Sequence, residues 1–148
     1  MQHKTILSQD GTVHYWIARN DNVSDCIVFT HGVTADHTMF EKQIPYFSDN
    51  YTIILWDVPM HGLSKPYQKF TYQDTAEILH SILQKENIEK TFLVGMSMGG
   101  YPSQHFAIMY PDMVKGFVAL DTTPLGLKYY SKSDLWWLKR VVPMAKCF

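Results

Sequence analysis

Ser97 lies in the pattern Gly95-Met96-Ser97-Met98-Gly99, which can present a serine hydroxyl as a nucleophile. An apolar run precedes the pattern and helical spacing follows it, which predicts a sharp turn between a strand and a helix. Gly95 and Gly99 would remove side chains that clash at such a turn, and the helix N-terminus would supply amide donors. A glycine-rich turn with an idle serine is the structural alternative, and the strand–turn–helix setting favours the nucleophile.

His31-Gly32 follows another apolar run and forms a second motif. Backbone amides at such a position can stabilise an oxyanion. The N–H of Val33 is the candidate donor here, and the N–H of Met98 is its candidate partner. We expect His31 to orient this loop rather than to react, and Gly100 to allow close contact between the helix and a strand.

Asp57, His61 and Gly62 form a third motif in the segment that follows the apolar run ending at Trp56. Side-chain hydrogen bonds and a glycine turn can hold a loop of this composition in one conformation. We therefore predict structural roles near the site for Asp57, His61 and Gly62, and no catalytic role.

The elements that must position these motifs are indicated by apolar periodicity. Four continuous apolar runs indicate strands covered on both faces, as in a parallel sheet: Cys26–Thr30, Tyr51–Trp56, Thr91–Val94 and Val114–Leu120. Helical spacing occupies residues 72–83 and 98–110, and a hairpin is expected at the start of the chain. This alternation predicts an α/β fold with a mostly parallel sheet and flanking helices.

Composition excludes several classes of protein. The 148 residues include 13 Lys and Arg against 14 Asp and Glu, a formal charge of −1, which argues against a nucleic-acid or polybasic membrane partner. No apolar run approaches the roughly 18 residues of a spanning helix, and we expect no leader peptide in the first residues. Cys26 and Cys147 are expected to be reduced thiols, so a cytoplasmic location is predicted.

The three motifs, in this order on successive strand ends, resemble the α/β-hydrolase family, and most closely its small serine esterases and lipases. The resemblance covers about residues 12–124. It implies that Ser97 forms an acyl-enzyme with a small ester-like substrate, that the amides of Val33 and Met98 form the oxyanion hole, and that no cofactor is needed. Metal ligation is not indicated, because no H-E-x-x-H or paired Cys/His spacing occurs.

The chain departs from the family in its catalytic base, because the family orders its triad as Ser, acid, His. Only His105 follows Ser97, and at about 12 Å along the same helix it cannot face the serine. Asp121 is a possible acid, although a turn cap is the favoured interpretation, and His37 and His61 are weak surrogate bases. The general-base histidine is therefore expected outside this chain, which alone would be nearly inert.

The domain prediction places the N-terminal part of a hydrolase core in residues 1–124 and the start of a lid in residues 125–148. The sheet would be truncated before its last strands, leaving Val114–Leu120 as an exposed edge. This edge and the aromatic tail around Trp136-Trp137 predict self-association. A non-catalytic binding or assembly module on a hydrolase-like scaffold is the alternative function.

Overall fold

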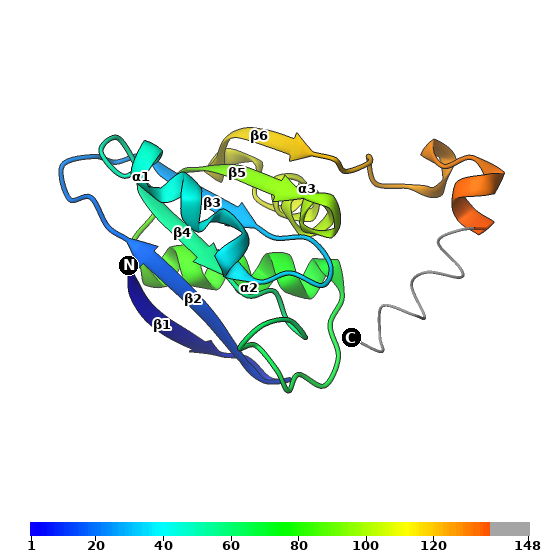
Figure 1. The fold of residues 1–148 in the computed structure, drawn as a ribbon, viewed down its shortest axis with the longest axis horizontal. Coiled ribbons are helices and arrows are strands. Elements are labelled where there is room, and N and C mark those ends of the chain that lie inside the picture. The colour runs from blue at the N-terminus through cyan, green and yellow to red at the C-terminus, as the bar shows by residue number, and fades with distance from the viewer. Residues whose placement is uncertain (137–148) are drawn as a thin grey trace.

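Six strands form one mixed sheet in the computed structural model, which describes residues 1–136 (Figure 1). The strands are β1 Gln2–Leu7, β2 Thr12–Ala18, β3 Cys26–Thr30, β4 Thr52–Trp56, β5 Thr91–Met96 and β6 Val114–Leu120. Their order in the sheet is β1-β2-β4-β3-β5-β6. β2 is antiparallel to both its neighbours, whereas β4, β3, β5 and β6 run parallel. The predicted opening hairpin and mostly parallel sheet are thereby confirmed.

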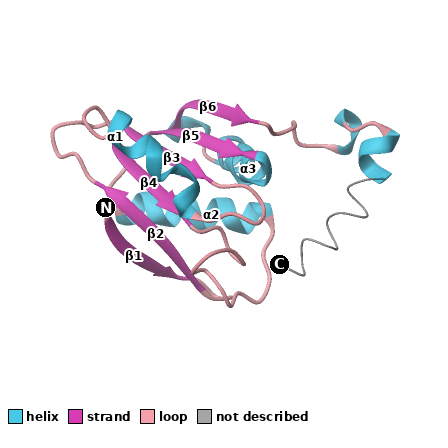
Figure 2. Ribbon diagram, viewed as in Figure 1, coloured by secondary structure: helices cyan, strands magenta, loops and turns pink. Residues whose placement is uncertain are grey.

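Helices cover both faces of this sheet (Figure 2). The α-helices are α1 Ile44–Phe47, α2 Tyr72–Lys85 and α3 Gly100–Met109, and the short 3-10 helices are η1 His37–Gln43, η2 Ser97–Gly99, η3 Pro111–Met113 and η4 Leu127–Tyr129. A further helical turn occupies residues 132–136. In Figure 1, η1 and α1 lie in front of the sheet and α2 lies behind it.

The hydrophobic core is divided between the two faces of the sheet. Val28 and Leu93 pack with Leu79 of α2 and Phe106 of α3 in the larger cluster. Neighbouring strand positions face the other way, where Phe29 packs in a smaller cluster with residues of β4 and η1. Burying one such side chain stabilises the fold by about 1.5–3 kcal/mol. Coverage on both faces explains why the strand sequences are continuously apolar.

Two predicted boundaries need correction around Ser97. The strand expected over Thr91–Val94 continues to Met96, and the helix expected from Met98 begins as the 3-10 turn η2 before α3 starts at Gly100. The cause is the tight turn itself. The left-handed backbone of Ser97, with φ of +50°, interrupts the strand and delays the regular helix.

β6 is an edge strand, because in the described part of the chain its one sheet neighbour is β5. Val118 and Leu120 on this strand remain 49% and 38% exposed. The chain beyond β6 projects past the end of the sheet (Figure 1). Self-association through this edge, and a lid in residues 125–148, remain predictions, and Trp137 lies outside the described residues.

No helix within residues 1–136 combines the length and apolarity needed to cross a membrane.

Candidate active site

Ser97 lies on the turn that joins β5 to α3, at the carboxyl edge of the sheet. Its φ of +50° is in the left-handed region, which a serine adopts only where the surrounding structure enforces it. The side chain is partly exposed rather than enclosed by the core. The turn therefore presents a serine hydroxyl at the sheet edge, directly before the first turns of a helix.

The glycines around Ser97 make this turn possible. A Cβ atom on Gly95 would lie 2.6 Å from the carbonyl oxygen of Gly99, and one on Gly99 would lie 2.3 Å from the carbonyl oxygen of Thr30. Both clashes are with backbone atoms, which cannot move aside cheaply. The close contact at Gly100 is instead with Thr122, in the segment after β6, so the expected contact with a strand is not the one formed.

The loop after β3 lies directly beside Ser97. A Cβ atom on Gly32 would lie 3.5 Å from the Cβ of Ser97, so this backbone approaches the serine closely. Val33 follows and is 44% exposed. The loop that carries the candidate donor Val33 thus lies beside the turn that carries the other candidate donor, Met98.

His31 is fully buried and connects two loops. Its Nδ1 lies 2.7 Å from the carbonyl oxygen of Gly32, and its Nε2 accepts the N–H of Val58 at 3.0 Å. Because Nε2 accepts, Nδ1 carries the proton and donates. Burial lowers the pKa of His31, which keeps the ring neutral. This bonding occupies both ring nitrogens and joins the loop after β3 to the loop after β4.

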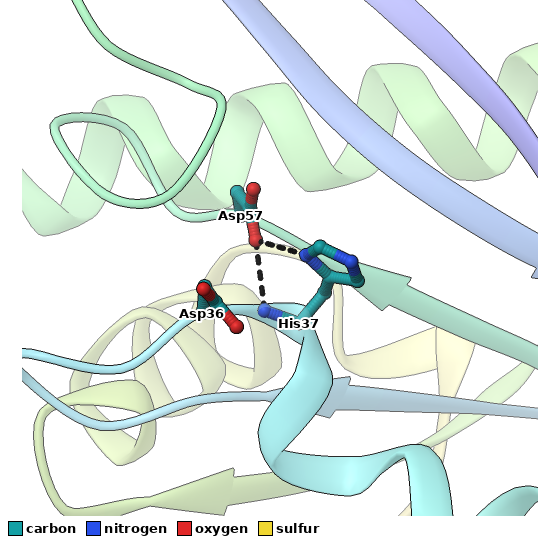
Figure 3. A group of neighbouring side chains, drawn as sticks. All are labelled: Asp36, His37 and Asp57. Carbon is teal, nitrogen blue, oxygen red and sulfur yellow. Dashed lines mark hydrogen bonds and ion pairs between the residues drawn. The ribbon is translucent and has the colours of Figure 1, made fainter.

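Asp57 connects the loop after β4 to the loop after β3, and it is fully buried (Figure 3). Its Oδ1 accepts the backbone N–H of His37 at 2.8 Å and the Nδ1–H of the same residue at 2.9 Å, and its Oδ2 accepts the N–H of Leu63 at 2.7 Å. Gly62 has φ of +48°, and a Cβ there would lie 2.2 Å from Oδ2. The carboxylate is thus enclosed by donors and by a glycine that no other residue could replace without strain.

His61 lies in the same loop and is partly exposed. Its Nδ1 is 3.0 Å from the carbonyl oxygen of Pro59, and its ring is 5.2 Å from the ring of His31, centroid to centroid. These contacts place His61 near the loop that borders Ser97. In the described residues no hydrogen bond joins His61 to that serine.

Asp36, His37 and Asp57 form the one group in residues 1–136 whose ligand atoms lie close enough to hold a metal ion, within 4.8 Å of one another. One oxygen of Asp36, both oxygens of Asp57 and Nδ1 of His37 are already hydrogen-bonded. Asp36 accepts the N–H and Oγ1–H of Thr38, and these bonds lower its pKa. Asp57 accepts both donors of His37. We therefore interpret this group as a hydrogen-bonded junction between two loops (Figure 3).

Comparison with known proteins agrees with this geometry. A family model described as the alpha/beta hydrolase fold matches residues 25–145. The chain belongs to the alpha/beta-hydrolase family. Among curated proteins, it is 35% identical over 99 residues to a 2-(acetamidomethylene)succinate hydrolase of Mesorhizobium japonicum, covering 66% of this chain and 36% of that protein. It is 33% identical over 113 residues to an uncharacterized hydrolase, YugF, of Bacillus subtilis, covering 75% and 41%.

Solved structures show the same alpha/beta-hydrolase fold. A hydrolase from Pseudomonas aeruginosa superposes with a TM-score of 0.78 and 18% identity, covering 95% of this chain and 52% of that one. The chain spans about two fifths of the length of the curated relatives it matches. The match therefore establishes the family and fold of this chain, and the activity of the whole protein is a matter for proposal.

The seven histidines of this alpha/beta-hydrolase chain all lie in the described residues, and none is hydrogen-bonded there to Ser97. His105 stacks on Tyr72 of α2 at 6.4 Å between ring centroids. His37 is bonded to Asp57 and stacks on Trp16. The other five histidines are hydrogen-bonded or stacked on another ring elsewhere in the described residues: His3, His14, His31, His61 and His80.

Asp121 follows β6 at the carboxyl edge, is exposed and has φ of +47°. The next residues are held to α3 by a side chain that sequence reasoning missed. The carboxamide of Gln104 donates to the carbonyl oxygen of Thr123 at 2.9 Å and accepts the N–H of Leu125 at 2.9 Å. A glutamine in a helix gives no signal of this kind, because its partners are fixed only when β6 packs beside β5.

Ser64 is a second residue whose role sequence reasoning missed, and it is fully buried. Its Oγ donates to the carbonyl oxygen of Asp57 at 2.7 Å and accepts the N–H of His14 at 3.0 Å. It thereby closes the loop that carries His61 and ties it to β2. Its position seven residues after Asp57 in the third motif is the signal that could have identified it.

Proposed function

We propose that this chain carries the nucleophile of a serine hydrolase of the carboxylic-ester type, and that Ser97 is that nucleophile. The observation that carries the proposal is the left-handed turn at Ser97, built on glycines that admit no Cβ. A strained backbone at a partly exposed serine is retained where function uses it. The same turn in a strand–helix junction is the setting in which hydrolases of this family present a serine.

In the proposed reaction, Ser97 Oγ attacks the acyl carbon of the ester while a histidine base accepts its proton. The carbonyl oxygen becomes an oxyanion, which accepts hydrogen bonds from the N–H groups of Val33 and Met98. Collapse of this intermediate expels the alcohol and leaves an acyl-enzyme, which water then hydrolyses. His31, Asp57 and His61 hold the loops that carry or border the first donor.

The base is proposed to come from outside residues 1–148, from further chain or from another subunit. The support is that both ring nitrogens of His31 are engaged, that His37 is bonded to Asp57, and that His105 stacks on α2. Asp121 is a candidate acid at the correct edge of the sheet. We also propose a cytoplasmic location, where the free thiol of Cys26 would persist.

The first test introduces a thiol at the turn. In Ser97→Cys, the amide donors and helix N-terminus should lower the thiol pKa, so alkylation by iodoacetamide at pH 7 should be about tenfold faster than in Ser81→Cys. Ser81 is exposed on α2, so its variant reports an ordinary thiol. Burial raises the pKa of Cys26 to about 12, and peptide mapping separates the native cysteines from the introduced one. Equal alkylation rates would contradict a nucleophile turn.

The second test measures turnover of a simple aryl ester. The purified 148-residue chain should hydrolyse it near the background rate, because loss of a triad histidine costs on the order of 10⁶ in turnover in a well-studied serine protease. Full turnover by this chain would refute an external base. Activity of any longer form should vanish in Ser97→Ala and persist in Ser81→Ala, and activity that survives Ser97→Ala would favour the binding-module alternative.

A further inference from the structure

Two methionines flank Ser97, and they face opposite sides of the sheet. Met98 belongs to the larger core cluster, on the side of α2 and α3, and is 8% exposed. Met96 packs instead against the smaller cluster, on the side of η1 and α1. The two thioethers therefore sit in different environments, although they are separated only by Ser97.

The sulfur of Met96 contacts the loop that approaches Ser97. Its Sδ lies 3.1 Å from the position a Cβ would take on Gly32, and the backbone oxygen of Met96 lies 3.6 Å from the same position. Since Gly32 has no side chain, nothing separates the sulfur from the loop backbone. The next residue is Val33, whose N–H is the proposed oxyanion donor, so the thioether supports the position of that amide.

Met96 is also within reach of small solutes, because its side chain is partly exposed, whereas Met98 is buried. Thioether oxidation follows exposure and converts a flexible apolar side chain into a polar, chiral one. At Met96, the added oxygen would enlarge and polarise a sulfur that already lies against the Gly32 backbone and an apolar cluster. Because this contact is apolar and close, the loop is the part that has to move.

We propose that Met96 is a redox modification site, and that its oxidation by a peroxide displaces the Gly32–Val33 loop and switches off the site at Ser97. The sulfur lone pair attacks one peroxide oxygen, the O–O bond breaks, and an S–O bond forms. The second oxygen leaves as water after proton transfer. The sulfur loses two electrons and the peroxide gains them. The catalytic consequence rests on the proposed function, whereas the loop displacement does not.

The test treats the chain with hydrogen peroxide and follows each methionine by peptide mass spectrometry. Met1, Met39 and Met60, which are 48%, 39% and 40% exposed, should oxidise before Met96, and Met98 should oxidise after it. When Met96 is oxidised, amide hydrogen exchange over residues 31–36 should become about tenfold faster than in the untreated chain. A methionine sulfoxide reductase should restore the original exchange rate.

Matched variants assign the effect to one sulfur. Met96→Leu keeps the volume and removes the thioether, so peroxide should leave exchange over residues 31–36 unchanged, while Met39→Leu should remain as sensitive as the parent. Unchanged exchange in a chain fully oxidised at Met96 would overturn the proposal, as would an equal response in Met96→Leu.

A second measurement separates this inference from the proposed function. In a longer form of the protein that supplies the base, a fluorophosphonate probe should label Ser97, and labelling should fall several-fold after oxidation and recover with the reductase. No labelling of the untreated longer form, with loop exchange still responding to oxidation, would count against the proposed nucleophile and support the redox site. Labelling that persists unchanged in chain fully oxidised at Met96 would overturn the proposed switch.

Discussion

Two buried carboxylates anchor opposite ends of this sheet, and they are held in different ways. Asp57, at the carboxyl edge, is bound by the backbone amides of His37 and Leu63 and by one imidazole. Glu86 follows the C-terminal end of α2 and is 3% exposed. It is bound by side chains alone: Tyr15 at 2.7 Å, Lys4 at 2.9 Å and Arg19 at 2.7 Å.

The different partners of the two carboxylates predict different roles, the positioning of loops for Asp57 and the stability of the fold for Glu86. Backbone donors belong to the loops themselves, so the Asp57 carboxylate fixes the path of the loop after β3, which borders Ser97, and of the loop after β4. The partners of Glu86 are side chains of β1 and β2 or the residue just after β2, so this carboxylate fastens the opening hairpin to α2. Damage at Asp57 should therefore alter the site and the stability, whereas damage at Glu86 should alter the stability alone.

The largest effect is expected for Asp57→Asn. The amide keeps the shape of this buried side chain but offers one acceptor oxygen to three part-buried donors, so the free energy of unfolding should fall by about 2–4 kcal/mol. Denaturant titration measures this fall. In the folded variant, thiol alkylation at the Ser97→Cys position should also slow, because the neighbouring loops lose their fixed path. An unaltered alkylation rate would break the distinction between the two anchors.

The second prediction compares Gly99, in η2 at the carboxyl edge of the sheet, with Gly116, on β6. Gly99→Ala places a Cβ 2.3 Å from a backbone oxygen of Thr30 at the carboxyl edge, and should cost about 3 kcal/mol of unfolding free energy. Gly116→Ala lies towards the other end of β6, where the Cβ meets only the Phe92 ring at 3.2 Å. Ring adjustment and the lower entropy of the unfolded chain should leave that variant within about 1 kcal/mol of the parent. Thermal unfolding measures both variants. Equal losses of unfolding free energy would show that the backbone at the carboxyl edge is packed no more closely than β6 at Gly116.

The third prediction concerns Glu86→Gln. Removing the charge leaves Lys4 and Arg19, whose side chains are 28% and 40% exposed and can regain water, so the loss should be about 1–3 kcal/mol rather than that of an isolated buried pair. Thiol reactivity at Ser97→Cys should stay at the parent rate in this background. A slowed rate would mean that the hairpin anchor also shapes the site.

The sequence was a good guide wherever one short segment determines the outcome. Gly95 and Gly99 predicted the turn at Ser97, because the clash they avoid is local, and continuous apolar runs predicted the parallel strands. The sequence did not indicate that Glu86 binds Tyr15, because Tyr15 is 71 residues away and an isolated glutamate is usually solvated.

The same limit applies within the candidate site. His37 was considered as a surrogate base, and its bond to Asp57 could not be read from two loops 20 residues apart. The packing of Gly100 on Thr122 was missed for the same reason, because that contact forms only after β6 joins the sheet. Contacts between segments that the sheet brings together are thus what the sequence did not predict.

The smallest expected effect is the pH dependence that Glu86 adds to stability. Burial raises its pKa, but hydrogen bonds from Tyr15, Lys4 and Arg19 outweigh burial and hold the pKa below the ordinary value of 4.5. The unfolded chain therefore binds this proton at a higher pH than the folded chain. The contribution of the ionised carboxylate is complete above the unfolded pKa and is lost as pH falls through the folded pKa.

The measurement is the unfolding free energy of the parent and of Glu86→Gln between pH 7 and pH 3. The gap between them should stay constant down to about pH 5 and then shrink as the parent loses its ionised anchor. A gap that stays constant to pH 3 would mean that the interactions of Glu86 do not depend on its charge. The amino edge would then be held much as the carboxyl edge is, by hydrogen-bond geometry more than by ion pairing.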